Sequence, residues 1–308
     1  MVAGSNPAAV TFFTNIFIKF LLFNIYIVLV TIAGIIYLLK ILVEPIYIFI
    51  YNKPLVVHFY LFPQKLSIHH KEIISFYFPF YERLNAKNQK YFDHRVLKFI
   101  EVNKFVSREK IDVTFEMKLL IASTSTILTF GMQKYLYTVI STIIVYPSCF
   151  YSVTNDDLHI GEFNPKLKTL VFSWEDFYKG IKVDNNNLNL GIHEFSHALL
   201  FESQKKMKYG VASSYIFSDY YNEIINDLKN PEFLKSLINT GYFRKYAFVN
   251  SVEFIAVILE HFFETPEQFK ELFPELFMKV KTMINYNEKI FTQTISSNPQ
   301  LSALDSWL

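Results

Sequence analysis

An uncharged run near the start of the chain most constrains what this sequence can fold into. The run extends from Phe20 to Leu39, contains no Asp, Glu, Lys or Arg, and is bracketed by Lys19 and Lys40. Inside a bilayer the backbone has to satisfy its own hydrogen bonds, so about 20 apolar residues in a row favour one membrane-spanning helix. The alternatives are a buried core helix and a cleaved signal peptide. The length, and the lack of a small-residue cleavage site after the run, disfavour the signal peptide.

The residues on either side of this run predict how the chain is placed. A second apolar run, Ile41 to Tyr51, is interrupted by Glu44 and Pro45 and is expected to lie at the interface or to continue out of the bilayer. Lys19 precedes the first run, whereas three lysines follow the second. The positive-inside rule therefore predicts a single-pass protein of the cell inner membrane whose C-terminal bulk is cytoplasmic. The three lysines are Lys53, Lys65 and Lys71.

The residues at the two ends of the chain are not expected to belong to the folded domain. The first nine residues match nothing around them, and Gly-Ser-Asn-Pro at 4–7 is what translation of a conserved transfer-RNA gene arm produces. We hypothesise that they are an artefact and that the true start lies downstream. The expected organisation is an N-terminal tail at 1–19, an anchor and interfacial segment at 20–51, one folded domain at 55–290, and a flexible tail at 291–308.

Composition narrows the class of protein. The formal net charge of the 308 residues is only +2, with both signs mixed along the chain, which argues against a nucleic-acid-binding surface. A single cysteine, Cys149, allows no internal disulfide and fits a reducing compartment. Three histidines outside the motif described next show no metal-like spacing, so we interpret them as surface or packed residues: His69, His70 and His94.

The stretch 187–200 contains His-Glu-x-x-His in an apolar, helical setting. His193 and His197 are four residues apart, so on a helix both rings can face one metal ion, while Glu194 is placed to reach a water on that metal. A chance match is the alternative, but burying these groups without a partner would cost several kcal/mol. The pattern therefore predicts a Zn²⁺ site with a carboxylate base. The helical spacing is carried by Leu188, Ile192, Phe195 and Leu199.

The surrounding patterns predict an α+β fold, mainly helical, with a small sheet beside the motif helix. Helices are expected before the sheet at 64–80, 85–105 and 114–131. β-Branched runs predict strands at 138–146, 158–163 and 169–174. After the motif we expect loop and short helices at 213–229 and 232–239, then helices at 250–263 and 269–286.

A catalytic zinc ion usually takes three protein ligands, so a third is expected from another element. Glu253 is the best candidate because it lies in the first turn of an otherwise apolar helix, where the alternative role is to interact with the helix dipole. Glu260 shares the same helix face and is either a competitor or a group that supports a ligand. His261 is the third choice. Spacing alone leaves these alternatives open.

Several motifs that occur in order resemble the Mlc titration factor A family of zinc-dependent peptidases. The resemblance covers roughly residues 59–286. The motifs are Tyr146-Pro147 with Phe150, Val171 to Asp176, Asn189-Leu190 before His193-Glu194-Phe195-Ser196-His197, Tyr246-Ala247, Glu253-Phe254 with Ala256-Val257, and Glu260, Phe262-Phe263 and Pro266.

The resemblance implies a zincin-like domain with a gluzincin site. His193, His197 and Glu253 would be the zinc ligands, Glu194 the catalytic carboxylate, and Tyr246 the tyrosine near the reacting oxygen; without the resemblance Tyr246 reads as a packed aromatic. The chain departs from many family members at Leu199-Leu200, where they have Leu-Asp, and in its membrane anchor.

Together these observations predict a membrane-anchored zinc metallopeptidase that cleaves a peptide or protein substrate, with an aminopeptidase as one option. A zinc-activated water would attack the peptide bond and Glu194 would act as general base. The alternative function is a regulatory protein that binds and sequesters a transcription factor, with peptidase activity secondary. A purely structural zinc site is disfavoured, because such sites are often rich in cysteine and Cys149 is the only thiol.

Overall fold

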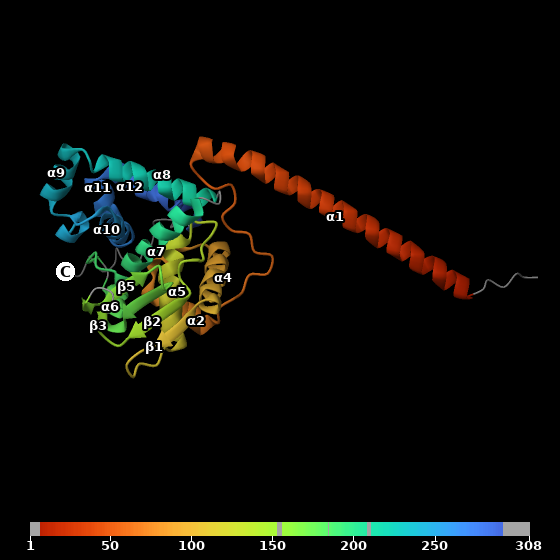
Figure 1. The fold of residues 1–308 in the computed structure, drawn as a ribbon, viewed down its shortest axis with the longest axis horizontal. Coiled ribbons are helices and arrows are strands. Elements are labelled where there is room, and N and C mark those ends of the chain that lie inside the picture. The colour runs from red at the N-terminus through yellow and green to blue at the C-terminus, as the bar shows by residue number, and fades with distance from the viewer. Residues whose placement is uncertain (1–6, 153–155, 184, 208–210, 292–308) are drawn as a thin grey trace, which may run out of the picture. The chain divides into compact units, whose positions relative to one another are not determined.

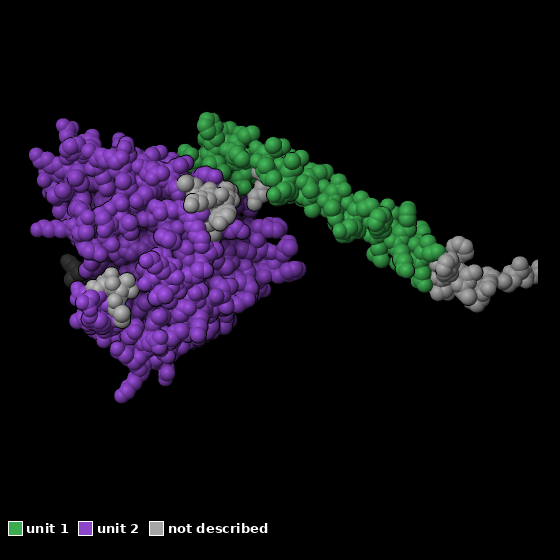
Figure 2. Space-filling model, in the orientation of Figure 1, with its two compact units in different colours: residues 1–55 green, residues 56–308 purple. Residues whose placement is uncertain are grey.

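The chain divides into two compact units, residues 1–55 and 56–308 (Figure 2). The computed structural model describes residues 7–152, 156–183, 185–207 and 211–291. The hypothesis about the first nine residues therefore falls mostly outside the described part, as does the expected tail beyond residue 291.

The first unit is one long helix, α1, from Pro7 to Tyr51. Its stretch Asn15–Tyr51 is long and apolar enough to cross a membrane, and none of its most apolar window is buried. The second apolar run continues as the same helix through Pro45. With 45 residues the helix is about 68 Å long, against about 30 Å for a bilayer's hydrocarbon core.

The second unit holds a four-stranded sheet in the order β1-β2-β6-β5, made of β1 (Lys104–Ser107), β2 (Thr142–Tyr146), β6 (Thr169–Ser173) and β5 (Gly161–Asn164). The first three strands run parallel, and β5 runs antiparallel to β6 at one edge. A separate antiparallel pair joins β3 (Phe150–Ser152) and β4 (Asp157–His159). The predicted small sheet is present.

All three predicted strands differ from the observed ones, for identifiable reasons. The strand predicted from residue 138 begins at Thr142, because the backbone N–H groups of Thr138 and Val139 donate to the Glu202 carboxylate rather than to a neighbouring strand. The strand predicted at 158–163 is divided at Ile160, where the chain passes from β4 to β5. The expected strand at 169–174 ends one residue early, because Ser173 caps the next helix.

Helices make up most of the second unit, and polar residues begin several of them. Ser67, Asn85, Thr114 and Asn250 each accept a hydrogen bond from a first-turn backbone N–H, as N-caps do. The helices are α2 (Ile68–Tyr77), α3 (Pro79–Arg83), α4 (Ala86–Val102), α5 (Phe115–Thr129), α6 (Trp174–Lys182), α7 (Leu190–Met207), α8 (Ala212–Asp227), α9 (Pro231–Thr240), α10 (Ser251–Glu264), α11 (Pro266–Leu272) and α12 (Pro274–Met283), with the short 3-10 helices η1 (Lys245–Phe248) and η2 (Glu288–Ile290).

Several helices differ from the predicted ones, in one case because of a proline. The region expected to be one helix at 269–286 is split into α11 and α12 at Pro274, which begins the second of them. Where loop and short helices were expected at 213–229 and 232–239, the structure has the 16-residue helix α8 and the 10-residue helix α9. Helix α6 was not predicted at all.

Helix α7 lies at the centre of the unit, between the sheet and α10 (Figure 1). It contacts the helices α5, α6, α8 and α10 and the strands β5 and β6. Phe195, at the middle of α7, is fully buried against the rings of Phe99, Tyr137 and Phe172. This packing fixes the rotation of α7 and therefore which of its residues face the edge of the sheet.

Candidate metal centre

Asn189 sets the start of α7 through three hydrogen bonds. Its Oδ1 accepts from the backbone N–H of Ile192 at 3.0 Å, and its amide nitrogen donates to the carbonyl oxygen of Gly180 at 3.2 Å. Its own backbone N–H donates to Glu260 Oε2 at 2.9 Å. The first turn of α7, which carries His193, is therefore tied both to α6 and to α10.

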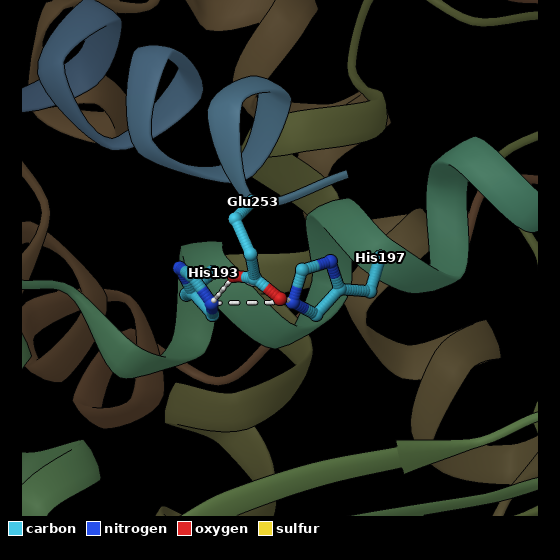
Figure 3. Close-up of side chains that lie close together, drawn as sticks. All are labelled: His193, His197 and Glu253. Carbon is cyan, nitrogen blue, oxygen red and sulfur yellow. Dashed lines mark hydrogen bonds and ion pairs between the residues drawn. The ribbon is translucent and has the colours of Figure 1, made fainter. Parts of the chain in front are cut away.

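Two histidines of α7 and one glutamate of α10 converge (Figure 3). The Nε2 atoms of His193 and His197 lie 3.1 Å apart. Glu253 Oε2 lies 3.0 Å from His193 Nε2 and 3.6 Å from His197 Nε2. The first turn of α10 delivers this carboxylate, and Asn250 holds that turn in place by accepting from the Glu253 backbone N–H at 2.9 Å.

These three residues fit a metal ion. Glu253 Oε2 is buried and, although close to His193 Nε2, makes no well-directed hydrogen bond. Two facing imidazole nitrogens and a carboxylate oxygen have more lone pairs than protons to share. One cation between them would satisfy all three atoms, and an N, N, O donor set is common for Zn²⁺.

The electrostatics of the cluster favour positive charge at its centre. Burial disfavours the protonated ring of His193, but the nearby carboxylates of Glu253 and Glu260 outweigh it and raise the pKa of His193 to about 9. Burial and the neighbouring His193 lower the pKa of His197 to about 4. Burial also opposes ionisation of Glu253, yet both histidines hold the pKa of its carboxyl below the ordinary value. A metal ion can supply the same positive charge as the proton on His193.

The other two candidate ligands lie elsewhere. Glu260 lies behind His193, and its Oε1 is 2.8 Å from Nδ1 of the ring. The Nδ1–H group of His193 therefore donates a hydrogen bond to this carboxylate. His261 packs among rings instead, 4.5 Å from Tyr242 and 4.9 Å from Phe243 between centroids.

Arg244 completes the arrangement behind His193, and sequence reasoning missed it. Its guanidinium donates to both oxygens of Glu260, at 2.6 and 3.1 Å, and to the carbonyl oxygen of Asn187 at 2.6 Å. Glu260 is thus held by two elements, and it in turn orients the His193 ring, a role usual for carboxylates behind metal-binding histidines. No spacing rule links Arg244 to Glu260, because the two residues come from different elements.

Glu194 is buried beside the three clustered residues but is not one of them. Burial and the charges of Glu253 and Glu162 raise the pKa of its carboxyl to about 7, against the opposing effect of His193. Gly161 of β5 packs directly on this side chain: a Cβ at position 161 would lie 2.7 Å from Glu194 Oε1 and 2.8 Å from its Cγ. A carboxylate that titrates near neutrality can both accept and release a proton.

Tyr246 lies on η1 at the open side of the cluster. Its ring centroid is 6.0 Å from that of His193, and the residue is half-buried. Burial and the nearby Glu253 carboxylate raise the pKa of its hydroxyl to about 12, so the group remains a hydrogen-bond donor at neutral pH.

Comparison with known families agrees with this arrangement. Residues 60–284 match the model of the glucose-regulated metallo-peptidase M90 family. The chain belongs to this family. The matched region covers α2 to α12 and therefore the whole four-stranded sheet and the convergent cluster. The peptidase family expected from the motifs is confirmed, and membership implies that the protein is a metallopeptidase.

A relative that is itself uncharacterized matches most of the chain. An uncharacterized protein of Synechocystis sp., slr2042, is 24% identical over 240 residues, which cover 72% of this chain and 85% of that protein. This match therefore indicates no substrate for the chain.

Proposed function

We propose that this protein is a membrane-anchored zinc metallopeptidase of the gluzincin type, with His193, His197 and Glu253 holding Zn²⁺ and Glu194 acting as general base. The observation that carries the proposal is the convergence of two Nε2 atoms and one carboxylate oxygen from α7 and α10, in a member of a metallopeptidase family. A sequestering protein would need neither this cluster nor Glu194, so the cluster favours the enzyme over that alternative.

The chain's own groups divide the work. Bound zinc would supply a Lewis acid that polarises the scissile carbonyl and makes a water molecule more acidic. A carboxylate oxygen of Glu194 takes a proton from the attacking water and later delivers it to the nitrogen of the leaving amine. The Tyr246 hydroxyl donates a hydrogen bond to the carbonyl oxygen of the substrate as charge develops there; losing one such donor typically costs about 3 kcal/mol.

Strand β5 offers a place for the substrate backbone. Strand β6 is paired on both sides, with β2 and with β5, so it has no free edge. Strand β5 forms one edge of the sheet, and it begins at Gly161, the residue that touches Glu194. An extended peptide added to this edge would pass beside the general base, which is the strand-addition mode of peptide binding.

The anchor is the second part of the proposal. Helix α1 would cross the cell inner membrane once, with the catalytic unit in the cytoplasm, because the lysines after the apolar run outnumber the single Lys19 before it.

The test uses the full chain in detergent or nanodiscs, with metal analysis and a library of fluorogenic peptides that includes N-terminally blocked members. Glu194→Gln should keep the metal and lose cleavage, because the amide cannot take the proton. His197→Ala should lose both, and Glu271→Gln, at an exposed position of α11, is the matched control. Cleavage at the wild-type rate by Glu194→Gln would refute the mechanism, and blocked peptides separate endopeptidase from aminopeptidase action.

A further inference from the structure

Three large apolar side chains point into solvent from the segment that precedes α2. Phe59 is 75% exposed, Leu61 74% and Phe62 90%. Their neighbours point the other way: the His58 ring stacks on Tyr91 at 4.9 Å, and the Tyr60 ring lies 4.3 Å from that of His94. We refer to Phe59, Leu61 and Phe62 as the apolar hook. Figure 1 shows its segment as an orange loop along the outside of α4, where Gln64 N–H bonds to His94 Nδ1 at 3.1 Å.

A buried arginine of α4 fixes this segment. Arg95 is fully buried, and its Nε donates to the Tyr60 hydroxyl at 2.7 Å. One terminal nitrogen donates to the carbonyl oxygens of Thr129 and Phe130, and the other to those of Val57 and Met132. The inward side of the segment is therefore tied to the end of α5, so the hook cannot fold back onto the core without breaking buried hydrogen bonds.

Scattered exposed apolar residues are normal, but three of this size close together on a fixed segment are not. We infer that the apolar hook inserts into the interfacial region of the bilayer that α1 crosses, so that the catalytic unit is docked on the membrane as well as tethered to it. This inference rests on the anchor in the proposed function and not on the peptidase chemistry.

The charges around the hook suit a membrane surface. No Asp or Glu occurs from Pro45 to Lys71, whereas Lys53, Lys65 and Lys71 all lie in that interval. Lys71 pairs with Asp93 at 2.9 Å, but Lys53 and Lys65 are exposed. Basic residues next to a membrane-spanning helix are attracted to the anionic lipids of the cytoplasmic leaflet.

The length of the connection allows the contact. If residues 20–39 fill the hydrocarbon core, the twelve helical residues from 40 to 51 rise about 18 Å above it. The eight residues from Tyr51 to Phe59 can span at most about 28 Å. The chain is therefore long enough to bring the hook back to the headgroup region, and α1 keeps it close to one leaflet.

Site-directed spin labels on the full chain test this inference. Cys149, the only cysteine, is exposed and is replaced by Ser; single cysteines then report from Phe62→Cys, Phe59→Cys, Val30→Cys and Leu167→Cys. Each protein is reconstituted into vesicles of phosphatidylethanolamine and phosphatidylglycerol, and collision with oxygen, which favours lipid, is compared with collision with a water-soluble nickel chelate. Leu167, in the β5–β6 turn and 69% exposed, is the aqueous control, and Val30 in α1 reports the anchor.

We expect the ratio of oxygen to nickel collision to be several-fold higher at positions 59 and 62 than at 167. A lipid signal at 30 with an aqueous signal at 62 would overturn the hook and leave the anchor standing. Protection of position 62 from both reagents, with spin–spin broadening between copies, would assign the surface to a second copy and also overturn it. Aqueous signals at both 30 and 62 would refute the anchor itself.

Discussion

Gly161→Ala probes the contact between the sheet edge and the proposed general base. The new Cβ would lie 2.7 Å from both Glu194 Oε1 and Leu190 Cδ1, and 2.8 Å from Glu194 Cγ. Ordinary carbon contacts begin near 3.4 Å, so the Glu194 side chain has to move by about 0.6 to 0.7 Å in a buried site. Overpacking of this kind typically costs about 1–3 kcal/mol of stability. Misplacing a catalytic group by about 1 Å can lower the rate about 100-fold.

The assay for Gly161→Ala compares kcat/KM, metal content and Tm with those of the wild type. We expect kcat/KM to fall between about ten- and a hundredfold, with metal content unchanged because the atoms nearest to the new Cβ belong to Glu194 and Leu190, neither of which is a proposed ligand. Leu190→Ala alone and the double variant Gly161→Ala/Leu190→Ala show which neighbour of the new Cβ matters. If Glu194 is the displaced group, adding Leu190→Ala to Gly161→Ala should not restore activity. Wild-type kcat/KM in Gly161→Ala, or full rescue by Leu190→Ala, would refute the reasoning.

Three further predictions concern the metal, stability and pH. Glu253→Gln should weaken metal binding, measured by competition with a chelator. Glu260→Gln should still bind the ion, with a smaller loss of affinity than Glu253→Gln. Equal metal affinity in Glu253→Gln and wild type would contradict the ligand assignment. Arg95→Met should lower stability by at least about 3 kcal/mol, since several buried hydrogen bonds to a charged group are lost, which is a fall in Tm of about 6–12 °C for a unit of this size; an unchanged Tm would contradict it. Burial raises the pKa of the Glu264 carboxyl to about 7, so the folded protein binds its proton more tightly than the unfolded chain. That contribution to stability is present below pH 4.5 and is lost as pH rises to about 7, and Glu264→Gln should flatten this slope in thermal melts at pH 5 and pH 8.

The parts that sequence patterns predicted are those with local signals. Helix α7 was predicted from its apolar spacing, and α4, α5 and α10 from the patterns of their own residues, because periodicity and capping depend on a few neighbouring residues. The pairing of His193 with His197 follows from helix geometry alone. Glu253 could be ranked first among three candidates, but choosing between it and Glu260 required the rotation of α10 relative to α7, which no local pattern contains.

The parts that were missed depend on contacts between distant segments. β1 has only four residues and becomes a strand by pairing with β2. α6 begins at Trp174, and its Ser173-x-x-Asp176 capping signal was present, but those residues had already been assigned to a strand. The roles of Gly161 and Arg244 come from the residues that they contact. Gly161 lies against Glu194 and Arg244 binds Glu260, and neither partner is near in sequence.

The hydrogen bonds behind His193 have a consequence for how the ion would arrive. Because Glu260 accepts the Nδ1 proton and is itself fixed by Arg244 and Asn189, the Nε2 atom is held facing His197 and Glu253 by groups that would not touch the ion. The ring is thus oriented when the chain folds, before any metal is bound. Loading should therefore be a local, reversible exchange on an already folded protein, and a chelated sample should regain its ion without refolding.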